Sequence, residues 1–193
     1  MNTLKKSLAL LGIMSVWGSI SLPTSAQTPQ VLIAQVSAED FFNRGVEKFD
    51  AGDLEGAIAD YNEAIRLNPN YAIGYYNRGN ARANSGDLEG AIADFDEAIR
   101  LNPNLAEAYI VRGNARANSG DLEGAMTDFD EAIRLNPNYA DAYSSRGLAR
   151  AISGDVSGGK MDLQRAAELF EQQGNTAMLQ TVMSLLEQLN FSR

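Results

Sequence analysis

The sequence predicts an all-helical protein built as a stack of helix hairpins. Residues 38–71, 72–105 and 106–139 restate nearly the same 34-residue sequence, and residues 140–173 form a weaker fourth copy. A period of this length is typical of repeats that cannot bury their own apolar faces and must stack on their neighbours. Within each copy, apolar and small residues recur at helical spacing in two segments. We therefore expect about four hairpins in an all-α solenoid.

The third copy, residues 106–139, serves as the template for each hairpin. Between its two helical segments lies Gly120, which suits the left-handed position after a helix, and Asp121, which suits the N-cap of the next one. The second segment should end at Pro137, since proline lacks an amide hydrogen and clashes inside a helix. The apolar and small residues of the two segments are Tyr109, Gly113 and Ala117, and then Ala125, Phe129, Ala132 and Ile133.

These positions resemble the pattern of the tetratricopeptide repeat family, over residues 38 to about 173. Each copy has an early aromatic residue, a glycine four positions later where two helices approach closely, and, in the first three copies, a closing proline. The aromatic residues are Phe41, Tyr75, Tyr109 and Tyr143, the glycines are Gly45, Gly79, Gly113 and Gly147, and the prolines are Pro69, Pro103 and Pro137. The resemblance implies a right-handed α-solenoid.

Two charged positions depart from the usual family pattern. An arginine precedes each close-approach glycine, and an aspartate precedes the second-helix aromatic position: Arg44, Arg78, Arg112 and Arg146, with Asp60, Asp94, Asp128 and Asp162. In an antiparallel hairpin these positions come close together, so we predict a repeated ion pair with the arginine stem covering apolar surface. The alternative is that the arginines are simply solvated, because exposed pairs contribute little.

The last part of the chain is expected to close the array. In the fourth copy Gly159 replaces alanine, Leu163 replaces the aromatic residue, and no proline follows. Residues 174–193 contain a segment, Thr176 to Leu189, with a broad leucine and methionine face, which resembles the family's capping helix. The alternative use of that face is dimerisation.

The first 26 residues have the layout of a secretory signal peptide. A short basic start precedes an uncharged, mostly apolar run, Ser7 to Leu22, and small residues follow up to Ala26. The run is short for a bilayer span, so we expect cleavage after Ala26 and no stable membrane insertion afterwards, with a retained anchor as the alternative. Residues 27–37 then form a linker. Repeats of this arginine-glycine type resemble those common in photosynthetic bacteria, which indicates a periplasmic, thylakoid-lumen or secreted protein.

Composition excludes several kinds of function. The formal charge is −9, and removal of Lys5 and Lys6 with the signal leaves 14 basic side chains against 25 acidic ones. Such a field repels nucleic acids and favours basic or neutral partners over acidic ones. The chain has no cysteine and no histidine, which removes thiolate chemistry and the commonest general base and metal ligand. We expect no enzyme activity, cofactor or metal site.

The family resemblance also implies a peptide-binding groove along the first helix of each repeat. Carried over position by position, the groove residues are Phe42, Tyr76, Asn80, Asn84, Ile110, Asn114 and Asn118. The fourth copy places Ser144, Leu148, Ala151 and Ile152 at the same positions. Asparagine can both donate to and accept from a peptide backbone, while Tyr76 and Ile110 would anchor apolar side chains.

The family's carboxylate clamp for acidic C-terminal tails requires lysines on this face. After the signal the chain has only Lys48 and Lys160, and neither matches a clamp position. The prediction is therefore an exported scaffold or assembly factor, a monomer or weak oligomer, that binds a polypeptide in its groove. The alternative from another class is a structural protein that self-associates through its ends.

Overall fold

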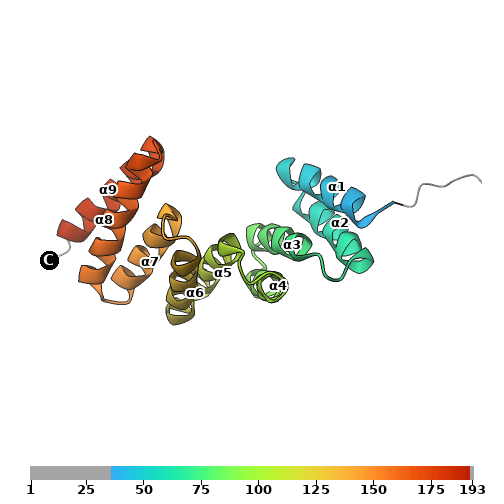
Figure 1. Ribbon diagram of the computed structural model, residues 1–193, viewed down its shortest axis with the longest axis horizontal. Helices are drawn as coiled ribbons and strands as arrows, with labels where there is room; N and C mark the ends of the chain where they lie inside the picture. The colour runs from blue at the N-terminus through green and yellow to red at the C-terminus, as the bar shows by residue number, and fades with distance from the viewer. Residues whose placement is uncertain (1–35, 192–193) are drawn as a thin grey trace, which may run out of the picture. The chain divides into compact units, whose positions relative to one another are not determined.

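The computed structural model describes residues 36–191, and these form nine α-helices without a strand. The expected signal peptide, residues 1–26, and most of the expected linker lie outside the described residues. Among the described helices, none combines the length and apolarity that a membrane span requires. The helices follow one another in chain order along the array (Figure 1): α1 Ala38–Asp50, α2 Leu54–Leu67, α3 Ala72–Ser85, α4 Leu88–Leu101, α5 Ala106–Asn118, α6 Leu122–Leu135, α7 Ala140–Ile152, α8 Val156–Gln172 and α9 Thr176–Phe191.

Consecutive helices pair as hairpins, each closed by a tight turn of the predicted kind. Gly120 has a φ of 94°, which only glycine adopts without strain, and Asp121 caps α6 by accepting a hydrogen bond from the Gly124 amide at 2.9 Å. Between hairpins, the Asn136 side chain accepts from the Asn138 amide at 3.1 Å across the proline, and this fixes the turn into α7. The prediction of an all-helical solenoid is confirmed.

The two helices of each hairpin come close together at the glycine that recurs at the same position of every repeat. A Cβ atom added to Gly113 would lie 2.6 Å from Cε1 of Phe129, which is fully buried. Gly79 and Phe95 have the same relationship, as do Gly45 and Tyr61. The aromatic ring of the second helix therefore occupies the space where any larger residue would place its side chain.

The fourth hairpin uses a tighter version of this contact. Here Gly147 faces Gly159, and a Cβ atom on Gly159 would lie 2.6 Å from the Gly147 carbonyl oxygen. Leu163 replaces the ring and is fully buried. Gly159 and Leu163 stand where the other repeats have an alanine and an aromatic ring. These two smaller residues allow the backbones of α7 and α8 to meet directly.

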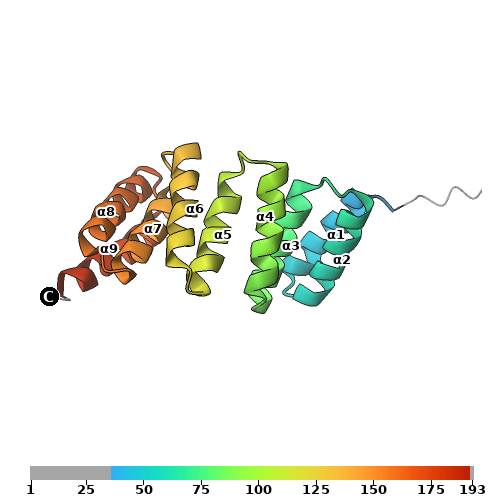
Figure 2. The same ribbon diagram turned by 90° about the horizontal axis from the view of Figure 1, so that it is seen from below.

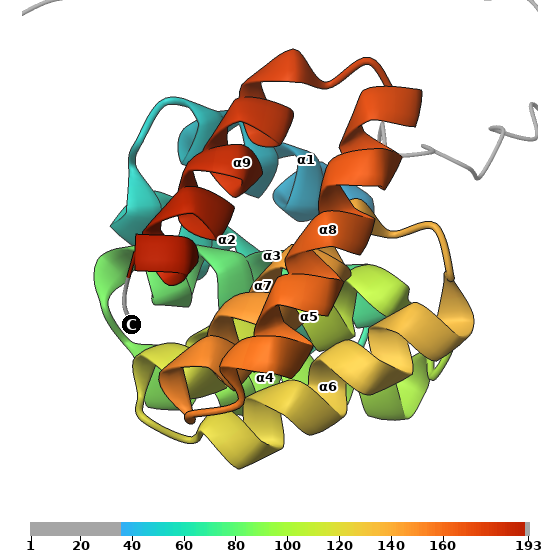
Figure 3. The ribbon, with the colours of Figure 1, turned by 90° about the vertical axis from the view of Figure 1, so that its left-hand side faces the viewer.

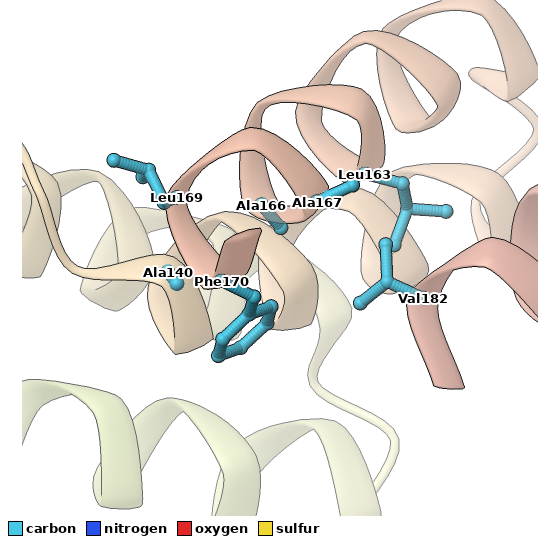
Figure 4. Packing of buried hydrophobic residues seen from close by; sticks show 7 residues of the cluster. All are labelled: Ala140, Leu163, Ala166, Ala167, Leu169, Phe170 and Val182. Carbon is cyan, nitrogen blue, oxygen red and sulfur yellow. The ribbon is translucent and has the colours of Figure 1, made fainter. Parts of the chain in front are cut away.

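Helix α9 covers the C-terminal end of the array. It lies alongside α8 (Figure 3) and contributes Val182, which is fully buried in a cluster with Leu163 and Phe170 (Figure 4). The side facing away from α8 carries exposed polar residues, among them Gln180, Thr181 and Ser184. This is the arrangement expected of a capping helix, and it leaves a mostly polar outer face.

The first helix of the described array carries acidic side chains at repeat positions that are buried in the later repeats. In later repeats, two small residues of the first helix are buried at equivalent positions, as Ala108 and Ala115 are in α5. The equivalent positions in α1 hold Asp40 and Glu47, both exposed to solvent. A hairpin stacked on α1 would have to desolvate these carboxylates.

The first helices of the repeats lie on one side of the stack. Helix α3 contacts both α1 and α5, and α5 contacts α7, besides the contacts between helices adjacent in sequence. Figure 2 shows the odd-numbered and even-numbered helices following one another in turn along the array. The odd-numbered helices α1, α3, α5 and α7 therefore form a continuous surface, here called the inner face, on which a groove can lie.

Candidate functional site

A buried aspartate lies at the centre of every hairpin, bound by an arginine from the inner-face helix. Arg112 donates to Asp128 at 2.5 and 3.0 Å in a bidentate pair, and only 2% of Asp128 is exposed. Arg78 binds Asp94 at 2.6 and 2.9 Å, Arg146 binds Asp162 at 2.7 and 2.8 Å, and Arg44 binds Asp60 in the same way. The predicted pairing of arginine with aspartate is confirmed in all four repeats.

Each buried aspartate also binds a second cation, which the sequence analysis missed. Arg116, one helical turn after Arg112, donates to Asp128 at 2.9 Å. Arg82 and Arg150 do the same to their aspartates at 2.8 Å, and Lys48 lies 2.7 Å from Asp60. The signal was present in the sequence as a basic residue four positions after each arginine, on the same face of the helix.

The first arginine also joins neighbouring repeats. Arg112 donates to Asp96 of the preceding hairpin at 2.6 Å, and Arg146 donates to Asp130 at 2.5 Å. At the first junction the acceptor is the neutral Asn62, 2.6 Å from Arg78. Each of these guanidinium groups also lies over the aromatic ring three residues earlier, for example Arg112 over Tyr109 at 5.4 Å. One arginine therefore holds a hairpin together and fixes it to the previous one.

The charge of Asp60 is strongly favoured in this network. Hydrogen bonds from Arg44, assisted by Lys48, lower the pKa of Asp60 to about 2 despite the opposing effect of burial. The same hydrogen bond raises the pKa of Arg44. The pair therefore stays ionised at any physiological pH, as a structural element of the hairpin.

The network has a direct consequence for the inner face. Among the described residues, α1, α3, α5 and α7 carry eight basic side chains, and all eight are bound to the four buried aspartates: Arg44, Lys48, Arg78, Arg82, Arg112, Arg116, Arg146 and Arg150. Each of these cations already has an aspartate partner within the protein, while half of the Arg44 side chain stays exposed to solvent.

Four of the predicted groove residues gather around one hollow of about 250 Å³ between α3 and α5. Asn80, Asn84, Asn114 and Asn118 line it together with Leu88, Phe95 and Val111. The Asn84 amide donates to the Asn80 backbone carbonyl at 3.0 Å. Within residues 36–191, the side chains of Asn80, Asn114 and Asn118 make no hydrogen bond, so their amides are open to solvent at the hollow.

A second hollow of about 360 Å³ continues from the first one toward α7. It shares Asn114 and Asn118 with the first hollow and adds Leu122, Phe129, Leu148 and Ile152. Leu148 is 42% exposed and Ile152 is 64% exposed, although both are aliphatic. They occupy the repeat positions of Asn114 and Asn118, so the inner face changes from amide to aliphatic between α5 and α7.

The three remaining candidates lie outside a shared site. Phe42 packs on Tyr71 in an edge-to-face contact with ring centroids 5.2 Å apart, and Tyr76 packs on Phe95 at 6.2 Å. Both keep a partly exposed edge. Ile110 was expected to be an exposed anchor, but it is only 6% exposed because it packs on Ala132 and Ala142 in the junction between repeats. Stacking of the fourth hairpin covers it, and we remove it from the candidate set.

A third hollow, of about 640 Å³, lies between α8 and α9. Leu179, Met183 and Leu186 line it, with Lys160 and three glutamates at its margin. It lies beside the capping helix and has no equivalent in the repeats, so it is considered separately below. In the part of the chain that the structure describes, no three acidic side chains come together in a way that could hold a metal ion.

The fold and the inner face together define a helical repeat scaffold whose exposed surface, not an enclosed cleft, is available to other molecules. Comparison with protein families agrees with this class. Residues 45–86 and 113–153 match the model of the TPR repeat, and residues 72–105 match the model of the tetratricopeptide repeat. Together these matches cover more than half of the chain, which belongs to the tetratricopeptide repeat proteins.

Solved structures show the same relationship. The crystal structure of MamA is similar, with 26% identity and a TM-score of 0.69, over 72% of this chain and 81% of that one. The first TPR domain of Spaghetti (RPAP3), bound to the HSP90 peptide SRMEEVD, has 26% identity and a TM-score of 0.60, over 61% and 94% of the two chains. The Arabidopsis OM64 TPR domain has 27% identity and a TM-score of 0.59, over 60% and 96%. No curated protein sequence matches significantly.

Proteins with this fold generally bind peptides or other proteins and act as scaffolds, and they are typically not enzymes. The chemistry of the inner face can differ between them. The Spaghetti domain binds a peptide that contains three acidic residues, SRMEEVD. In the described part of the present chain, every cation of the inner face is already bound to an aspartate.

Proposed function

We propose that this protein is an exported scaffold or assembly factor that binds a polypeptide along its inner face. The observation that carries the proposal is the row of unpaired asparagine amides across α3 and α5. Asn80, Asn114 and Asn118 present both donors and acceptors around an uncharged hollow. Such groups can bind the backbone of an extended segment in place of water.

The proposed parts of the chain follow from the repeat period and the N-terminal composition. The signal peptide, residues 1–26, directs export and is removed, and residues 27–37 form the linker to the first repeat. The four repeats span residues 38–173, and the cap spans residues 174–193. The destination is the periplasm, the thylakoid lumen or the extracellular space. The partner is neutral or basic, because the chain has a net charge of −9 and the cations of its described inner face are each paired with a buried aspartate.

The alternative is a structural protein that associates with itself through its ends. The hollow between α8 and α9 favours it, since Met183 there is 48% exposed. The exposed carboxylates of Asp40 and Glu47 on the first helix and the polar outer face of α9 oppose it. Sedimentation at several concentrations separates the two functions, because a concentration-independent monomer rules out self-assembly.

A capture experiment tests the proposed groove. The purified protein is compared with a triple variant, Asn80→Ala, Asn114→Ala and Asn118→Ala, which removes only exposed or half-exposed amides. A matched control carries three exposed polar changes elsewhere: Thr127→Ala on α6, and Gln180→Ala and Ser184→Ala on α9. We expect the asparagine variant to lose the partner and the control to retain it. Equal capture by both variants would remove the groove from the proposal.

A further inference from the structure

The two hollows of the inner face differ in chemistry in a way that repeat position explains. Asn114 and Asn118 lie at the boundary and line both hollows. On one side the equivalent positions are Asn80 and Asn84, and on the other they are Leu148 and Ile152. An extended segment lying across α3, α5 and α7 would therefore meet amides first and an aliphatic surface at the end.

The second hollow has more than enough room for a large aliphatic side chain. Its volume is about 360 Å³, and apolar groups of Leu122, Phe129, Leu148 and Ile152 line it. Leu148 and Ile152 are exposed to water in the present structure, which is unfavourable for aliphatic side chains. An incoming leucine or isoleucine would cover them, whereas an incoming charged side chain would lose its hydration without gaining a partner.

Exposed acidic residues flank, in sequence, one leucine that lines each hollow. Leu88 lines the first hollow and stands between Asp87 and Glu89, and Leu122 lines the second and stands between Asp121 and Glu123. All four acids are exposed. The aspartates cap α4 and α6, but Glu89 and Glu123 make no ion pair among the described residues. A basic residue of a bound segment that reached the start of α4 or α6 would meet the carboxylate of Glu89 or Glu123. The nearby arginines Arg82 and Arg116 are already bound to Asp94 and Asp128.

We infer that the partner presents an extended basic segment with one aliphatic anchor, whose backbone lies on Asn80, Asn114 and Asn118 and whose aliphatic side chain fills the hollow formed by Leu148 and Ile152. This inference rests on the proposed function, since it names the chemical class of the polypeptide that the groove binds. Binding tightens at low salt, because the exposed charges of Glu89 and Glu123 are screened as ionic strength rises.

Synthetic peptides of about ten residues test the inference, a length that spans roughly three neighbouring helices when extended. The first peptide carries a leucine flanked by lysines in a glycine and serine background. Three others replace the leucine by serine, the lysines by glutamate, or the lysines by serine. Fluorescence anisotropy measures their binding to the purified protein. We expect the lysine and leucine peptide to bind at least about tenfold more tightly than the other three.

A double variant of the protein tests the surface that would bind the aliphatic anchor. The double change Leu148→Asn and Ile152→Asn installs the residues that the two preceding repeats already have at these exposed positions, so the fold is retained. It should abolish the preference for leucine over serine and leave the preference for lysine. The changes Glu89→Gln and Glu123→Gln should do the reverse, and they leave both N-caps intact.

The possible results distinguish a failure of this inference from a failure of the proposed function. If peptides bind in a manner that depends on the three asparagines but prefer glutamate, or ignore Leu148→Asn and Ile152→Asn, the inference is overturned and the groove remains. If the natural partner identified by capture binds through the asparagines with an acidic segment, the result is the same. If neither the peptides nor the captured partner depends on Asn80, Asn114 and Asn118, the proposed function fails and the inference fails with it.

Discussion

Arg112 in the third hairpin donates a hydrogen bond of 2.6 Å to Asp96 in the second, while its other nitrogens bind Asp128 in its own hairpin. The Arg112 side chain is only 13% exposed, because the stack of helices encloses it. Stability within a repeat and stability between repeats therefore depend on the same side chain. In a solenoid, where each unit contacts only its neighbours, this couples the hairpins into one cooperative array.

Removing a buried aspartate should destabilise the array strongly. Asp128→Ala leaves Arg112 and Arg116 without their shared carboxylate, and breaking one side of a buried pair costs about 3 kcal/mol or more. Urea unfolding followed by circular dichroism measures the loss. The control is Glu131→Ala, which breaks only the exposed pair with Arg134 and should leave the midpoint almost unchanged. Similar midpoints for the two variants would show that the buried network is not structurally important.

A methyl group at a close-approach glycine should separate the two helices of that hairpin. Gly113→Ala places a Cβ atom against the Phe129 ring, and overpacking of this kind costs about 1–3 kcal/mol. Adding Phe129→Leu, the residue type that the fourth repeat has at this position, should recover part of the loss. Thermal unfolding of the single and double variants measures both effects. No destabilisation by Gly113→Ala would mean that the ring can move aside without cost.

Adding one negative charge at the first junction between repeats should increase the stability of the protein. Asn62 is the neutral counterpart of Asp96 and Asp130, so Asn62→Asp gives Arg78 a charged acceptor. Because the position is solvent-exposed, the gain should be small, about 0.5 kcal/mol, and should disappear at 1 M salt. Asp96→Asn should produce the opposite change. A gain that persists at high salt would require another explanation.

Acid should weaken the first hairpin through Asp60. Its pKa in the folded protein, about 2, is lower than its ordinary value of 3.8, so its charge stabilises the fold above about pH 4 and the contribution is lost as the pH falls toward 2. Its partner Arg44 is half exposed, so solvent screening reduces the contribution to on the order of 1 kcal/mol. Asp60→Asn should therefore lower stability at pH 7 and flatten its dependence between pH 4 and pH 2. An unchanged slope in this variant would mean that Asp60 is not the group that titrates.

The sequence was sufficient to predict the hairpins, because their signals are local and repeated. Gly120, Asp121 and Pro137 each determine a turn through their own backbone chemistry, and the pairing of Arg112 with Asp128 follows from antiparallel geometry. The second cation at each aspartate was missed, because a basic residue one turn along a helix usually remains in water.

The candidate site was less predictable, because it depends on how hairpins stack. The four asparagines could be placed on one face from the repeat alone. The burial of Ile110 could not, since it results from contact with Ala142 in the next hairpin. The apolar hollow likewise required both α5 and α7 in place before Leu148 and Ile152 could be recognised as part of the same groove.

We propose above that a polypeptide binds on the asparagine-lined inner face. Nuclear magnetic resonance of the isotope-labelled protein, titrated with the captured partner, tests it most directly, because every backbone and asparagine amide reports its own surroundings. We predict that the signals of Asn80, Asn114 and Asn118 shift together with those of Leu148 and Ile152, while Thr127 and Gln180 stay unchanged. Shifts confined to Met183, Leu186 and their neighbours between α8 and α9 would contradict the account.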